Sequence, residues 1–135
     1  MSITSNEFLE IKYSDGILYF TTLKGTPNEV EWAESQIMVD TWYNFCEKHG
    51  IKVGLIFDLK TLIFIKPSFL VDWVECFRCN AARTEKYVIA SAIIIENIII
   101  RQFINIFFSI YKNIKPTKIV SSINDGLQFI KMNTP

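Results

Sequence analysis

The chain has 135 residues, with 14 basic and 14 acidic side chains and a formal net charge of zero. This length predicts one domain, residues 1–135, with room for a real core, and the balanced charge gives no basic stripe that would recruit a nucleic acid. Half of the residues are hydrophobic and 11 are phenylalanine, so this apolar surplus must be buried in the core, in a partner or against a ligand.

The first third of the chain predicts a β-hairpin followed by a helix. Residues 8–13 and 17–23 form two apolar runs joined by Ser14-Asp15-Gly16, and Asp-Gly between apolar runs is a strong hairpin signal. Thr26, Pro27 and Glu29 then have the spacing of a capping box, which predicts a helix to about Lys48 with Gly50 as its stop. The expected inward stripe of this helix is Val30, Ala33, Ile37, Met38, Thr41 and Phe45.

The centre of the chain predicts a buried strand. Ile51 to Leu59 is nearly all apolar, which is typical of a strand covered on both faces, and Asp58 is the first polar side chain after that run. The expected elements that follow are a helix opened by Pro67-Ser68 and running to about Glu85, a strand at 88–95, a helix at 98–113 capped by Asn97, a strand at 118–122 and a closing helix at 125–132 with Ser122 before it.

These elements predict an α/β fold: a single-domain mixed sheet of about five strands in the order β-β-α-β-α-β-α-β-α. The sheet is expected to be parallel in its middle and antiparallel at the hairpin. Polar side chains interrupt the most apolar region, residues 88–111, so no membrane span is expected. Residues 1–6 are polar and show no leader pattern, which predicts a cytoplasmic protein.

The element order and the stretch from Asp58 to Leu70 resemble a STAS domain, the fold of anti-sigma-factor antagonists and of the tails of sulfate-type transporters. Asp58-Leu59 and Ile65 match the family pattern in position, Ser68 falls where the antagonists carry a phosphorylated serine, and Leu70 matches the leucine that follows it. Three positions depart from the motif: Lys66, Pro67 and Phe69 replace its aspartate, first serine and glycine.

The resemblance implies a non-enzymatic regulatory domain that acts by self-association or by binding a protein partner, modulated by phosphorylation of Ser68. The second half of the chain is more similar to the stage II sporulation protein AA-like branch, which is related to lipid-binding folds of the Sec14 type. That kinship implies the alternative, a carrier or sensor of an apolar small molecule or lipid. No cofactor is expected in either case.

Several polar residues are expected to share a rim beyond the carboxyl ends of the strands, where α/β sheets usually meet ligands or partners. The rim residues are Asp58, Lys66, Asn97 and Arg101, with Ser68 as the phosphoacceptor candidate. A phosphate on Ser68 would meet free amides and the positive end of a helix dipole. The alternative is an ordinary serine that satisfies an orphan amide at a helix start.

Four soft metal ligands occur in two pairs, Cys46-x-x-His49 and Cys76-x-x-Cys79. Their number fits a structural zinc site, but both pairs fall on predicted helices rather than on tight turns. Three reduced, partly buried thiols are therefore the expectation, with zinc as the alternative. No nucleophile, base and acid can be grouped from the sequence, so no catalytic residue is assigned.

The helix at 98–113 is apolar on more than one side. Its inward stripe is expected to be Ile100, Phe103, Ile104, Phe107, Ile110 and Tyr111. The remaining apolar side chains, Ile98, Ile99, Ile106 and Phe108, fall beside or opposite that stripe. An outward apolar patch usually marks a partner surface, so these four residues are the expected interface.

Overall fold

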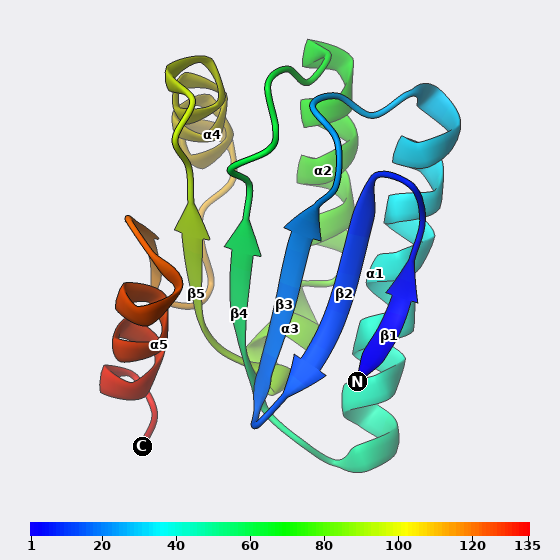
Figure 1. Cartoon of the computed structure of the whole chain (residues 1–135). Helices are drawn as coiled ribbons and strands as arrows, with labels where there is room; N and C mark the ends of the chain where they lie inside the picture. Colours follow the sequence, from blue (N-terminus) through cyan, green and yellow to red (C-terminus); the bar gives the residue numbers. More distant parts are fainter.

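The computed structural model describes all 135 residues, and a six-stranded sheet forms its centre (Figure 1). The strands lie side by side in chain order. The first three are antiparallel neighbours, whereas the third to the sixth pair in parallel. The predicted mixed α/β sheet is therefore confirmed. The strands are β1 (Ser2–Ser5), β2 (Leu9–Ser14), β3 (Ile17–Thr22), β4 (Val53–Asp58), β5 (Val88–Ile94) and β6 (Thr117–Val120).

Four helices cover one face of the sheet and a fifth covers the other (Figure 1). The helices are α1 (Glu29–His49), α2 (Pro67–Cys79), α3 (Ala81–Tyr87), α4 (Ile98–Ile110) and α5 (Ile123–Met132). A cluster of 21 buried hydrophobic residues lies on the face of α1 to α4, and a cluster of seven lies under α5. The main hydrophobic core therefore lies between the sheet and the first four helices.

β4 is the interior strand that the apolar run predicted. It pairs with β3 on one side and with β5 on the other. Leu55 belongs to the large core and Ile56 to the cluster under α5, so its successive side chains are buried on opposite faces. The predicted hairpin between β2 and β3 is also present, with positive φ at Asp15 (49°) and Gly16 (82°).

Two elements differ from the sequence-based expectation. β1 was not predicted because Ser2-Ile-Thr-Ser has one apolar residue, Ile3, which packs against the core at the edge of the sheet. The expected second helix is divided at Asn80 into α2 and α3. The Asn80 Nδ2 atom donates to the backbone oxygen of Cys76 at 2.7 Å, while its backbone oxygen accepts from the amide of Thr84 at 2.9 Å.

The start of α1 lies two residues later than predicted. Asn28, and not Thr26, is the N-cap: its side chain accepts from the amide of Glu31 at 2.8 Å, and the Glu31 carboxylate accepts from the amide of Asn28 at 2.9 Å. Lys24 Nζ lies 2.8 Å from the same carboxylate. These hydrogen bonds, that of Lys24 first, lower the pKa of buried Glu31 despite its desolvation.

The buried face of α1 also differs from the expected stripe. Val30 and Ile37 are each 69% exposed, and of the predicted stripe only Met38 is fully buried. The apolar side chains that face the core are Trp32, Met38, Trp42, Tyr43 and Cys46. Apolar residues occur all round this helix, and the large aromatic rings occupy the side that packs on the sheet. No helix of the structure combines the length and hydropathy needed to cross a bilayer.

Candidate functional site

The carboxyl ends of β3, β4 and β5 lie together at one end of the sheet, from which the chain enters α1, α2 and α4 (Figure 1). Asp58 is the last residue of β4. Its carboxylate accepts from the backbone amide of Lys60 at 3.2 Å, and its backbone oxygen accepts from the Thr22 hydroxyl at 3.2 Å. Asp58 therefore fixes the turn after β4, which is the common use of an aspartate at such a position.

Ser68 lies in the first turn of α2, one residue after Pro67. Lys66 is the N-cap residue, and no side chain caps the helix. Ser68 therefore does not hydrogen-bond to a free amide at the helix start, which was the alternative to a phosphoacceptor role. Its hydroxyl is exposed, whereas the proline has no amide hydrogen and the amide of Phe69 already donates to the backbone oxygen of Lys66 at 3.0 Å. A phosphate here would meet fewer free amides than a regular helix start offers.

Lys66, Asn97 and Arg101 lie on the segments that border the same end of the sheet. Lys66 Nζ is 3.0 Å from the carboxylate of Glu29, in the first turn of α1. Asn97 caps α4, because its side-chain oxygen accepts from the amides of Ile99 at 2.8 Å and Ile100 at 3.3 Å. Arg101 is exposed on α4. Of these three side chains, Asn97 and Lys66 are already engaged within the chain.

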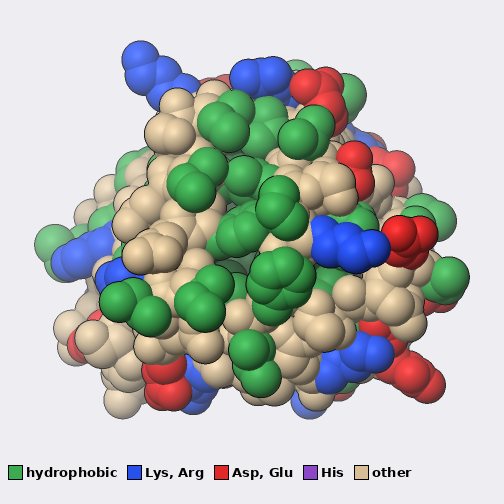
Figure 2. Space-filling view, turned by 90° about the horizontal axis from the view of Figure 1, so that it is seen from above, with side chains coloured by type: hydrophobic (Ala, Val, Ile, Leu, Met, Phe, Trp, Pro, Cys, Tyr) green, Lys and Arg blue, Asp and Glu red, His purple; other side chains and the backbone are tan.

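The same end of the molecule carries many exposed apolar side chains (Figure 2). The loop after β4 is held close to the loop after β3, since the backbone oxygen of Gly25 accepts from the amides of Ile63 at 2.7 Å and Phe64 at 3.1 Å. A Cβ atom on Gly25 would lie 2.9 Å from Ile63 Cδ1, the end of an exposed side chain that can move aside. Ile63 and Phe64 are left exposed by this arrangement.

α4 carries an outward apolar seam. Ile99, Ile106 and Ile110 are each about half exposed (50%, 51% and 48%), and half-buried Phe103 lies between them in sequence. The spacing of these four residues is four, three and four, which places them along one side of a helix in the pattern of a heptad seam. We call these residues the α4 seam. Ile110 was expected to point inward, and the structure places it outside.

Two of the other predicted interface residues lie apart from the seam. Ile98 is exposed in the first turn of α4, as expected. Phe108 is half-buried instead: its ring lies 5.8 Å from that of Phe107, and it lines a pocket beneath α4. The expectation that Phe108 shares the outward surface is corrected, because its position on the helix turns it toward the sheet.

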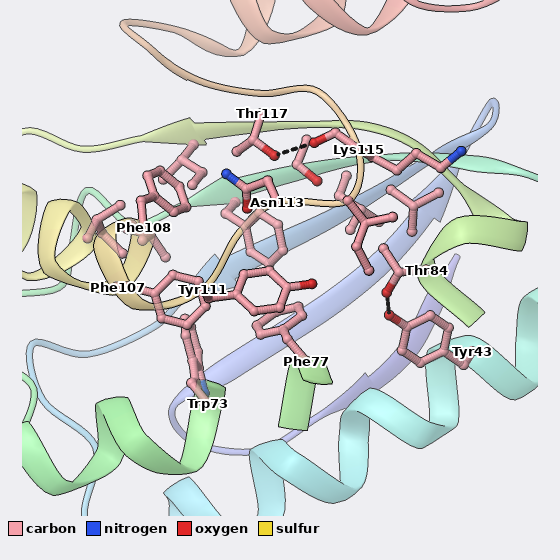
Figure 3. A pocket seen from close by; sticks show the side chains of 18 residues that line it. Tyr43, Trp73, Phe77, Thr84, Phe107, Phe108, Tyr111, Asn113, Lys115 and Thr117 are labelled. Carbon is pink, nitrogen blue, oxygen red and sulfur yellow. Dashed lines mark hydrogen bonds between the residues drawn. The ribbon is translucent and has the colours of Figure 1, made fainter. Parts of the chain in front are cut away.

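A largely apolar pocket lies between the sheet and helices α2, α3 and α4 (Figure 3). Thirteen of its 18 lining residues are hydrophobic. The centre of a water molecule can occupy about 70 Å³ of it. Because a single water needs about 10–15 Å³ on this measure, the pocket has room for several waters or for one small molecule. A second pocket on the other side of α2 shares four residues with the first: Phe57, Leu59, Trp73 and Phe77.

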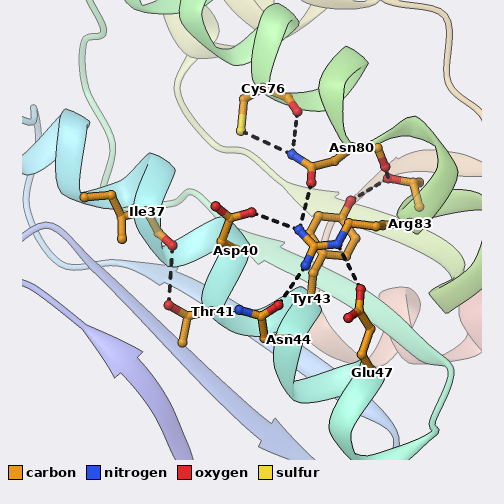
Figure 4. A network of polar contacts seen from close by, with 10 residues as sticks. Ile37, Asp40, Thr41, Tyr43, Asn44, Glu47, Cys76, Asn80 and Arg83 are labelled. Atoms are coloured by element: carbon orange, nitrogen blue, oxygen red, sulfur yellow. Dashed lines mark hydrogen bonds and ion pairs between the residues drawn. The ribbon is translucent and has the colours of Figure 1, made fainter.

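Arg83 of α3 ties that helix to α1 (Figure 4). Its guanidinium lies 2.9 Å from the Asp40 carboxylate and 3.0 Å from that of Glu47, and it stacks 5.1 Å from the centre of the Tyr43 ring. It also donates to the side-chain oxygens of Asn44 at 2.7 Å and Asn80 at 3.2 Å. The two carboxylates raise the pKa of Arg83 against its partial desolvation. The network anchors α3, whereas α2 is held mainly by apolar contacts.

Tyr43 is fully buried beneath this network, and its hydroxyl is hydrogen-bonded to that of Thr84. Burial raises the pKa of Tyr43 to about 12, although the Thr84 hydrogen bond opposes the shift. The raised pKa means that folding favours the neutral phenol, so its contribution to stability is complete below pH 10 and is lost as the pH rises toward 12.

We therefore expect the free energy of unfolding to fall by about 2–3 kcal/mol through Tyr43 alone between pH 10 and 12. Urea unfolding at a series of alkaline pH values measures this loss. A Tyr43→Phe variant is the control, since its stability should show a correspondingly smaller dependence on pH. Equal slopes for the two proteins would contradict the assignment.

The cysteines and His49 are not assembled into a metal site. Cys46 is buried in the core, Cys79 is exposed at the end of α2, and His49 stacks on Phe45 with ring centres 4.5 Å apart. No three histidine, cysteine, aspartate or glutamate side chains lie close enough together to hold a metal ion. The zinc alternative is therefore not supported. Burial raises the pKa of Cys46 to about 11, which keeps this thiol protonated at neutral pH.

No model of a known family matches the chain, and no curated protein matches it. A solved structure does: a protein of the DUF3478 family from Shewanella loihica PV-4, described as having a SpoIIAA-like fold. The alignment covers 94% of this chain and 98% of that one, with a TM-score of 0.61. The chain has a SpoIIAA-like fold. The two sequences are 14% identical, so the likeness concerns the fold alone.

The SpoIIAA-like fold is the STAS-type fold that the Asp58–Leu70 stretch and the element order predicted. Within it, Asp58, Lys66, Asn97 and Arg101 lie on segments at one end of the sheet; their role as a rim for a ligand or partner stays a prediction. The sequence reasoning missed the Arg83 network, because Asp40 and Arg83 are 43 positions apart in the chain and no local pattern links the members of the network. The α4 seam was missed in part, although the spacing of Ile99, Phe103, Ile106 and Ile110 could have revealed it.

Proposed function

We propose that the protein is a non-enzymatic interaction domain that pairs with a second copy of itself through the α4 seam. The observation that supports this proposal is the row of half-exposed isoleucines on a helix with a single charged residue, Arg101. The lone histidine is stacked on Phe45 at the end of α1, with ring centres 4.5 Å apart.

A second α4 seam is a suitable occupant for this surface. Side chains at heptad spacing pack as knobs into holes against an identical row, and two copies related by a two-fold axis present the same surface to each other. Arg101 lies on the outer side of α4, away from the seam, and the chain has zero net charge. Charge repulsion therefore does not oppose the approach of two copies.

The seam contains only four side chains, so the interface would lie at the small end of the range for specific complexes. We expect weak association, with a dissociation constant in the micromolar range or above. Light scattering from the micromolar to the millimolar range tests this: the average mass should rise from 15.7 kDa toward twice that value. A constant mass of 15.7 kDa at all concentrations would contradict self-association.

Ser68 is proposed as a site that modulates this behaviour. Its exposed hydroxyl is two residues from Lys66, whose ammonium is bound to Glu29. A phosphate on Ser68 would compete with Glu29 for that ammonium and so change the contact between the starts of α1 and α2. Mass spectrometry of protein from its native source tests whether Ser68 is phosphorylated. An unmodified Ser68 under all growth conditions would contradict this proposal.

A second candidate function is the binding of a small apolar molecule in the pocket beneath α2 and α4. The pocket favours it, because well-packed cores leave few voids larger than a water molecule, whereas this one has about 70 Å³ of water-accessible space. Native mass spectrometry should then detect a bound small molecule, or binding should appear on titration with one. If no bound molecule is detected and no added small apolar molecule binds, this candidate function is excluded.

A further inference from the structure

The apolar pocket contains a few polar side chains that have no hydrogen-bond partner in the chain, namely Ser91, Asn113 and Tyr111. The Tyr111 side chain is 7% exposed, and its ring packs between Phe77 and Phe107 with ring centres 5.6 and 5.4 Å away. In Figure 3 its hydroxyl points into the pocket, and no hydrogen bond joins it to another lining residue. Trp32 Nε1 is the only fully buried side-chain polar atom without a partner, so the Tyr111 hydroxyl still faces open space in the pocket, where it can donate a hydrogen bond to an occupant.

Two other hydroxyls beside the pocket, those of Tyr43 and Thr84, are paired with each other. The Thr84 hydroxyl donates its only hydrogen to the backbone oxygen of Asn80 at 3.1 Å. Tyr43 must therefore donate in the Tyr43–Thr84 hydrogen bond. Tyr43 is 0% exposed, so its oxygen is out of reach of an occupant, whereas the Tyr111 hydroxyl points into the pocket (Figure 3).

The polar end of the pocket does not suit a charged group. Lys115 is the only cationic residue in its lining, and its ammonium lies 3.4 Å from the Glu85 carboxylate. In Figure 3 this ammonium extends away from the Tyr111 hydroxyl. An anion next to the Tyr111 hydroxyl would lose its hydration without gaining a cation, and buried unpaired charges are strongly disfavoured.

We propose that the pocket binds a small neutral molecule with an apolar body and one polar group, such as a hydroxyl, that accepts a hydrogen bond. This group would accept a hydrogen bond from the Tyr111 hydroxyl. The apolar body would lie against the aromatic and isoleucine side chains that form the rest of the pocket. This inference rests on the second candidate function, the binding of an apolar molecule, and names the chemical class that the site prefers.

Phenol and toluene test the proposal, because they have nearly the same shape and differ in one hydroxyl. Benzoate adds an anionic probe of similar size. Titrations followed by the isoleucine methyl NMR signals of Ile93 and Ile104, which line the pocket, report binding at the site itself. We expect phenol to bind about tenfold more tightly than toluene, which corresponds to one hydrogen bond made to a buried donor, and benzoate to bind more weakly than either.

The Tyr111→Phe variant keeps the ring and removes the hydroxyl, and Tyr19→Phe, on the other face of the sheet, is its control. Phenol should lose its advantage over toluene in Tyr111→Phe alone. If toluene binds as tightly as phenol to the unaltered protein, or if Tyr111→Phe keeps the preference, the hydroxyl proposal is overturned while the apolar pocket stands. If neither compound shifts the signals, the second candidate function fails and this inference fails with it.

Discussion

Replacing Trp42 by alanine is expected to lower the free energy of unfolding by about 3–5 kcal/mol. Trp42 is 1% exposed, stacks on Tyr43 with ring centres 3.7 Å apart and meets the Phe20 ring edge-on at 5.8 Å. Its removal would leave a cavity at the contact between α1 and the sheet. Small domains have a total stability of about 5–15 kcal/mol, so this variant is expected to unfold at a much lower urea concentration.

Ile37→Ala is the matched control on the same helix. Ile37 is 69% exposed, so its truncation should change the free energy of unfolding by about 0.5 kcal/mol or less. The sequence pattern alone would predict a large loss for Ile37→Ala, since it places Ile37 in the inward stripe of α1. A larger loss for Ile37→Ala than for Trp42→Ala, measured by urea unfolding, would show that α1 presents a different face to the core.

Replacing Ile106 by glutamate is expected to abolish self-association while leaving the fold intact. Ile106 is half exposed at the middle of the α4 seam, so a glutamate there remains hydrated in the free chain. In a dimer that pairs two α4 seams, this carboxylate would be buried against apolar side chains. The free-energy cost of that burial is far larger than the binding free energy of a weak interface. Light scattering should give a mass of 15.7 kDa at every concentration.

Ile37→Glu controls for the general effect of an added acidic residue. It makes the same substitution at an exposed isoleucine on α1, away from α4, and should associate as the unaltered protein does. If Ile37→Glu also prevents association, net charge and not the seam governs the effect. If Ile106→Glu still associates, another surface, such as that formed by Ile63 and Phe64, makes the contact.

Much of the fold could be predicted from the sequence because its signals are local and agree with one another. The apolar run at β4, the Asp-Gly turn and the Asn97 and Ser122 caps each depend on a few neighbouring residues. β1 could not be predicted, since a short edge strand needs little apolar character. The buried face of α1 could not either, because apolar residues surround that helix and only tertiary packing selects among them.

The candidate site was less predictable than the fold. Positions that depend on strand ends, such as Asp58 and Ser68, were placed near one end of the sheet by topology alone. The pocket depends on side chains from α1, α2, α3, α4 and three strands, such as Tyr43, Thr84 and Tyr111. These side chains come together only after the helices have packed, so no spacing along the chain could reveal the pocket.

Isoleucine methyl NMR at increasing protein concentration tests the pairing of α4 most directly. We expect the signals of Ile99, Ile106 and Ile110 to shift together as the concentration rises, because association would move these methyl groups from water into an apolar contact. The signal of Ile37, exposed on α1, should stay fixed. Fixed signals on α4 up to millimolar concentration, or shifts confined to isoleucines elsewhere, would contradict the proposal.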